Sequence, residues 1–141
     1  MRSDLLETRV AELVAGEAHR LLARVGLAEI LERVQLHKAG RMAGVQAMAA
    51  DPALSLYVVG DSLRALVARV SDPDALPEFP RLQVPRLRAE AIQRVLRALA
   101  DAYATVHGAL EDPASGYQAA EVAQAVRHSP AQVATLLGVG Q

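Results

Sequence analysis

Apolar side chains recur at steps of three and four residues through most of this 141-residue chain. The clearest case lies mid-chain, where the apolar positions are Leu56, Val59, Leu63, Leu66 and Val70. Residues three and four apart share one face of an α-helix, whereas a half-buried strand alternates every second residue. The spacing predicts a helix here, and because no stretch favours a strand, it predicts an all-α fold.

Further helices are expected on both sides of this segment. One should start with Ser3 as its N-cap and close at Gly26, and a second periodic stretch, either one long helix or two, runs from Leu27 to Asp51-Pro52. Four prolines predict a loop between Ser71 and Pro85, with Pro85 as the first residue of the next helix. That helix should reach Leu110 and span roughly 40 Å. We therefore expect an elongated antiparallel helical bundle, with residues 1–141 forming a single helical domain.

The end of the chain carries strong turn and capping signals. Asp112-Pro113 is expected to stop the long helix, and a short helical piece should follow around Glu121 to Val126. The stretch Ser129-Pro130-Ala131-Gln132 combines an N-cap serine, a proline at the first helical position and a glutamine at the third, which predicts a capping box. Val133, Leu136 and Leu137 are then expected to pack the last helix against the bundle.

Composition limits the classes of function. With 15 Lys and Arg against 16 Asp and Glu, the chain lacks the basic balance of a nucleic-acid-binding protein. The absence of cysteine excludes disulfides and cysteine-ligated metal sites. The most apolar window, Leu54 to Val70, contains Asp61, Arg64 and Arg69, so we expect no membrane span there. Aromatic residues make up only 3%, which predicts a core of Leu, Val and Ala.

One motif suggests an enzyme. Gly60-Asp61-Ser62-Leu63 resembles the nucleophile block of the GDSL-type lipases and esterases. That chemistry needs a serine on a turn after a buried strand, an oxyanion-stabilising asparagine and a histidine held by an aspartate. The sequence contains no asparagine and no histidine three residues after an aspartate. We therefore interpret Asp61 and Ser62 as two solvated helix positions, with the hydrolase as a remote alternative.

The remaining polar residues form no recognisable site. The four histidines, His19, His37, His107 and His128, show no metal-ligand spacing, and structural or surface roles are expected for them. The carboxylates are spread singly along the predicted helices, and no glycine-rich phosphate loop is present. We thus expect no catalytic residues, no metal and no cofactor.

Two further surface features are open to more than one interpretation. Positive charge gathers around the start of the long helix, but acidic residues interleave with it, which favours a solvated face over a patch for lipid headgroups or an acidic partner. The arginines concerned are Arg81, Arg86, Arg88, Arg94 and Arg97. Gly40 and Gly44 suggest close helix packing rather than membrane dimerisation.

The tail resembles a known family. Asp112-Pro113, Tyr117, His128-Ser129-Pro130, Gln132-Val133 and Leu136-Leu137 together resemble the carboxy-terminal signature of the conserved oligomeric Golgi complex subunit 6 family. The spacer between Tyr117 and Ser129 is slightly longer than in that signature and rich in alanine. Family members are several times longer than this chain and carry an amino-terminal coiled coil. The resemblance implies that these residues form the carboxy-terminal helical part of such a subunit.

The resemblance also implies a function. Such subunits are non-catalytic rods of helical bundles that tether retrograde vesicles in intra-Golgi transport and maintain Golgi organisation. The implied partners are the other subunits of the complex, together with SNAREs, Rabs and coat proteins. The implied location is the cytosol and the cytosolic face of the Golgi membrane, where the subunit is a peripheral protein. Within the tail, Tyr117 is expected to fix the loop after Asp112-Pro113 through its ring and hydroxyl. A freestanding helical regulatory or ligand-binding bundle remains the alternative.

Overall fold

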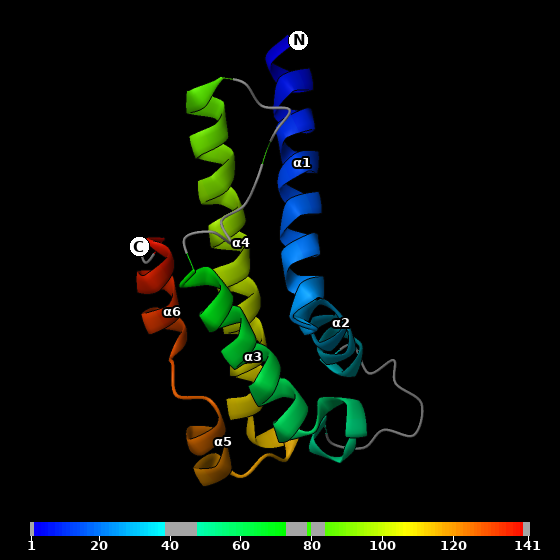
Figure 1. The fold of residues 1–141 in the computed structure, drawn as a ribbon. Coiled ribbons are helices and arrows are strands. Elements are labelled where there is room, and N and C mark those ends of the chain that lie inside the picture. The colour runs from blue at the N-terminus through cyan, green and yellow to red at the C-terminus, as the bar shows by residue number, and fades with distance from the viewer. Residues whose placement is uncertain (1, 39–47, 73–78, 80–83, 140–141) are drawn as a thin grey trace.

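The structure is a computed structural model that describes residues 2–38, 48–72, 79 and 84–139, and every regular element in these ranges is helical (Figure 1). The α-helices are α1 (Arg2–Arg24), α2 (Leu27–Lys38), α3 (Leu56–Val70), α4 (Pro85–Glu111), α5 (Ala119–Ala125) and α6 (Pro130–Leu137). Three short 3-10 turns are η1 (Met48–Ala50), η2 (Pro52–Leu54) and η4 (Pro113–Ser115). The prediction of an all-α bundle is confirmed.

Two long helices give the bundle its length. α1 and α4 lie side by side along the molecule and run in the same direction, as Figure 1 shows. Arg94 of α4 donates to the Glu7 carboxylate of α1 at 2.8 Å across the two helices. This pair also places one arginine of the predicted basic cluster in an ion pair between helices.

α4 is the helix that contacts most of the other helices of the bundle. Its buried residues repeat at helical spacing and are Ala91, Val95, Leu99, Ala100, Ala102, Tyr103, Val106, His107, Ala109 and Leu110. α1, α2, α5 and α6 all contact it, and α3 and α6 run antiparallel to it (Figure 1). Four of the buried residues are alanines, whose small side chains allow neighbouring helices to approach closely.

The central apolar pattern forms α3 as predicted. Val59, Leu63 and Leu66 on this helix are almost completely buried. Ser55 caps its start, because the Ser55 hydroxyl accepts from the Val58 N–H. The helix therefore begins and ends close to where its apolar spacing indicated.

The prediction for Ser62 was wrong. Its side chain is buried, and its hydroxyl donates to the Val25 carbonyl at 2.7 Å. That carbonyl lies at the turn between α1 and α2, where Gly26 has a φ of 79° and ends the run of helical hydrogen bonds. Ser62 lies in the middle of a helix and serves a structural hydrogen bond, whereas the neighbouring Asp61 side chain is exposed, as expected.

The start of α1 differs from the sequence prediction. α1 begins at Arg2, so Ser3 lies inside its first turn rather than at the cap. Of the second periodic stretch, which was expected to form one helix or two, the described parts are α2 (Leu27–Lys38), η1 (Met48–Ala50) and η2 (Pro52–Leu54). Gly40, Gly44 and Arg81 lie outside the described residues.

Replacing Ser62 by Ala should destabilise the fold. The substitution removes the donor to the Val25 carbonyl, an acceptor in a part-buried hydrogen bond, which should cost about 1 kcal/mol. Asp61→Ala is the matched control, since this neighbouring exposed side chain should change the free energy of unfolding by no more than about 0.5 kcal/mol. Urea denaturation followed by circular dichroism measures both. Equal effects of the two substitutions would contradict the structural role of Ser62.

Candidate functional site

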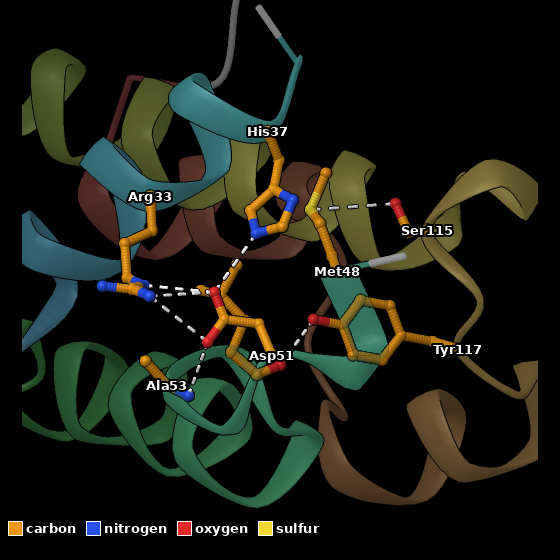
Figure 2. A network of polar contacts seen from close by, with 8 residues as sticks. Arg33, His37, Met48, Asp51, Ala53, Ser115 and Tyr117 are labelled. Atoms are coloured by element: carbon orange, nitrogen blue, oxygen red, sulfur yellow. Dashed lines mark hydrogen bonds and ion pairs between the residues drawn. The ribbon is translucent and has the colours of Figure 1, made fainter. Parts of the chain in front are cut away.

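The largest described group of polar contacts is centred on Asp51, between η1 and η2 (Figure 2). The Asp51 carboxylate accepts from the Ala53 N–H at 3.0 Å and from Arg33 Nη2 and Nε at 3.1 and 3.2 Å. His37 Nε2 lies 3.2 Å from the same carboxylate. The Asp51 side chain is only 10% exposed, so the Arg33 guanidinium of α2 compensates a charge that water scarcely reaches, with His37 in hydrogen-bond contact.

The surroundings of Asp51 stabilise its ionised form. The pKa of Asp51 is lowered from 3.8, chiefly by the hydrogen bond with His37, with further lowering by the Ala53 N–H and by Arg33. Burial acts in the opposite direction but does not prevail. Asp51 therefore binds α2 to the 3-10 turns as a carboxylate.

The loop after α4 joins this group from the other side. The Tyr117 hydroxyl donates to the Leu54 carbonyl at 2.5 Å, and the Ser115 hydroxyl lies 3.9 Å from Met48 Sδ (Figure 2). Burial and the nearby charge of Asp51 raise the pKa of Tyr117 to about 12, so the phenol keeps its proton at neutral pH. We call Arg33, His37, Asp51, Leu54 and Tyr117 the Asp51 network.

The network explains the tyrosine of the tail motif. Tyr117 was expected to fix the loop after Asp112-Pro113, and its hydroxyl connects that loop to η2. Asp112 caps η4 by accepting from the Ala114 N–H at 2.9 Å, with Pro113 as the first residue of the turn. Gly116 then takes a φ of 84°, which a residue with a side chain adopts only with strain.

The last helix begins as its sequence indicates. The Ser129 hydroxyl accepts from the Gln132 N–H at 3.1 Å, and the Gln132 side chain accepts from the Ser129 N–H at 2.8 Å. Pro130 occupies the first helical position, which completes the predicted capping box. The Tyr103 hydroxyl of α4 donates to the His128 carbonyl at 2.6 Å and so fixes the residue before the cap.

The apolar face of α6 is narrower than expected. Val133 and Leu137 are buried, but Leu136 is 53% exposed, which corrects the prediction that all three pack on the bundle. The helix lies at the edge of the bundle and contacts mainly α4, so only the stripe containing positions 133 and 137 is covered. Leu136 instead lines an open groove of about 430 Å³ together with His128, Ala131, Gln132 and Thr135.

The histidines serve different parts of the structure. His107 is buried, stacks on Tyr103 with ring centroids 6.1 Å apart, and has its Nδ1 3.0 Å from the Glu111 carboxylate. His37 belongs to the Asp51 network, and His19 is exposed. Within the described ranges, no three His, Cys, Asp or Glu side chains are placed to hold a metal ion.

The sequence did not reveal the Asp51 network. Asp51-Pro52 signalled only the end of a helical stretch, and Arg33 and His37 are one helical turn apart on α2 with no motif around them. Their common face on α2, at a spacing of four residues, is the one signal that was present. What brings them to Asp51 is the packing of α2 against η2.

Asp51→Asn tests the charge in the network. Because the pKa of Asp51 is lowered from 3.8 on folding, its contribution is fully present at neutral pH and is lost only as the pH falls below 3.8 and through the lower folded pKa. Asp51→Asn should cost about 1.5 to 3 kcal/mol at neutral pH and flatten this acid dependence.

Asp112→Asn is the matched control for that experiment. Asp112 opens the same kind of Asp-Pro turn, but within the described residues no Arg or His contacts it. This variant should keep the acid dependence of the unaltered chain. Urea unfolding at a series of pH values gives the comparison, and an unaltered pH profile in Asp51→Asn would refute the assignment.

Leu136 and Leu137 provide a second paired test. Leu137→Ala should destabilise the chain by about 2 to 5 kcal/mol, since the substitution leaves a cavity at a buried position. Leu136→Ala should change stability by less than about 0.5 kcal/mol, because that side chain is half in water. Thermal and urea unfolding distinguish the two, and the reverse order would contradict the observed placement of α6.

None of the helices in the described ranges combines the length and apolar content that crossing a lipid bilayer requires.

Comparison with known proteins extends the resemblance from the tail to nearly the whole chain. The family model for "Conserved Oligomeric Golgi complex subunit 6, C-terminal" matches residues 2–137. Conserved oligomeric Golgi complex subunit 6 of Arabidopsis thaliana is 30% identical over 136 residues, which cover 96% of this chain and 19% of the relative. The protein of the same name from Rattus norvegicus is 27% identical over 134 residues, 94% of this chain and 20% of the relative. No solved structure matches the chain significantly.

The chain thus spans about a fifth of the length of these two relatives. The match includes the Asp112-Pro113 turn, Tyr117 and the capping box of α6, since all lie within residues 2–137. The chain therefore belongs to the family defined by the carboxy-terminal region of conserved oligomeric Golgi complex subunit 6.

Proposed function

We propose that this chain acts as part of a non-catalytic subunit of a conserved oligomeric Golgi complex, in intra-Golgi retrograde vesicle tethering and Golgi organisation. The observation that carries the proposal is the family match across residues 2–137. The alternatives raised by the sequence have less support. Ser62 serves a hydrogen bond between helices, which disfavours a GDSL-type hydrolase, and the family match disfavours a freestanding regulatory or ligand-binding bundle.

The use of the polar residues supports a role in binding rather than catalysis. Asp51, Tyr103, Tyr117 and Ser62 each join two elements of the bundle through hydrogen bonds to backbone or to partner side chains. A catalytic group needs a free polar atom directed at a substrate. These groups instead hold a rod of helices in shape, which suits a subunit that presents surfaces to other proteins.

The partners follow from the proposed complex. The chain folds as a single helical domain, contacts other subunits, and reaches the cytosolic face of the Golgi membrane as a peripheral protein through them. SNAREs, Rabs and coat proteins are the further partners that a tether would engage.

Assembly with the complex tests the proposal. The chain, tagged and expressed in cells together with the other subunits of the complex, should co-purify with at least one of them and co-elute in size-exclusion chromatography. Leu137→Ala should reduce the yield of the assembly if it destabilises α6, whereas Leu136→Ala serves as the folded control. A chain that elutes alone or only with copies of itself, in the presence of all other subunits, would refute the proposed function.

A further inference from the structure

A groove between α2 and α3 differs from the other described surfaces in having an exposed aromatic residue at its edge. Its volume is about 360 Å³. The residues around it are Val25, Gly26, Glu29, Ile30, Arg33, Ala53, Tyr57, Val58, Asp61 and Ser62. Tyr57 is 80% exposed and the adjacent Val58 is 40% exposed.

The exposure of Tyr57 is unusual within this chain. The sequence has only three tyrosines and one phenylalanine, and Tyr103 and Phe79 are buried while Tyr117 is half-buried with its hydroxyl bonded to a carbonyl. Tyr57 is the aromatic residue left in water. Exposed tyrosines beside an apolar recess are typical of the residues that dominate the affinity of protein interfaces.

The polar groups in the floor of the groove already have partners. The Ser62 hydroxyl donates to the Val25 carbonyl, and the Arg33 guanidinium is bound to Asp51. Gly26 contributes no side chain, and Ile30 is buried beneath the surface. The part of the floor formed by Gly26, Ile30 and the bonded Ser62 hydroxyl therefore favours apolar side chains. Arg33, whose side chain is 41% exposed, borders this part with its charge bound to Asp51.

Two carboxylates, of Glu29 and Asp61, lie on the rim of the groove, and the one cation among the described residues that line it, Arg33, is paired with Asp51. Glu29 has no ion-pair partner among the described residues. Asp61 lies 3.7 Å from Arg64, but both side chains are at least half exposed, and such surface pairs are weak. Two carboxylates that can only accept hydrogen bonds thus border the apolar floor, a pattern complementary to Lys or Arg.

We propose that this groove binds an amphipathic helix of a partner protein, which inserts apolar side chains beside Tyr57 and Val58 and places Lys or Arg against Glu29 and Asp61. The inference rests on the proposed function and names the chemistry of one partner. A helix is favoured over an extended peptide because the described part of the chain has no strand edge to pair with it, and a helix satisfies its own backbone hydrogen bonds.

Two synthetic peptides test the proposal. Both carry leucines at helical spacing on one face, and the leucines are flanked by Lys in one peptide and by Glu in the other. Fluorescence anisotropy with the whole chain should give binding of the Lys peptide that is on the order of tenfold tighter than that of the Glu peptide. This preference should weaken with added salt, since the rim carboxylates are exposed.

Variants of the chain locate the binding. Tyr57→Ser should weaken the Lys peptide on the order of tenfold and leave the unfolding temperature unchanged, because the ring is mostly in water. Asp61→Lys should reduce or reverse the preference for the Lys peptide. Leu136→Ser is the matched control, as it removes an exposed apolar residue of α6 that does not line this groove and should leave binding unaltered.

Several outcomes would overturn the inference. These are no binding of the Lys peptide, equal binding of both peptides, or equal affinity in the Tyr57→Ser variant. A self-association of the chain that Tyr57→Ser abolishes would identify a second copy as the occupant, and would overturn it as well. If Tyr57→Ser leaves peptide binding unchanged while the chain still co-purifies with the other subunits, the groove inference fails and the proposed function stands.

Discussion

Burial of α4 is the constraint on which the other elements depend. α1, α2, α5 and α6 all contact this helix, and its covered residues, from Ala91 to Leu110, repeat at the helical period. Removing a Val or Leu side chain from water contributes about 1.5 to 3 kcal/mol, whereas a helix of this length gains little from its backbone propensity alone. The helices therefore form because they cover one another, and α4 offers the longest surface to cover.

The core is built from small and aliphatic residues, and this determines how polar groups are used. Because few aromatic rings fill the core, alanines on α4 let the helices approach closely. The hydroxyls of Tyr103 and Tyr117 donate to backbone carbonyls of other elements. Each hydroxyl satisfies a carbonyl outside the regular helical ladder. One of these hydrogen bonds holds η2, and the other holds the residue before α6. Both are short segments that bury too little apolar surface to be fixed by packing alone.

Asp51 and Asp112 illustrate how one local motif acquires two roles. Both open a 3-10 turn with an Asp-Pro pair, and both accept from the N–H two residues later. Only Asp51 also meets Arg33 and His37, because α2 packs against η2. Its charge is shielded from water and holds two elements together, whereas the charge of Asp112 remains a solvated cap.

The sequence alone determined the local structure and the family. Apolar spacing located the helices, Gly26 and the capping box of Ser129 marked ends, and the tail motif indicated the family that the whole-chain match supports. All of these depend on residues within a few positions of each other. The tertiary structure decided that Ser62 is buried, that Leu136 is exposed, that Arg33 and His37 meet Asp51, and that Tyr57 stands at the edge of a groove. Periodicity shows which residues share a helix face. How wide a part of that face becomes covered depends on helices distant in the chain. The partner of each buried polar atom also depends on them.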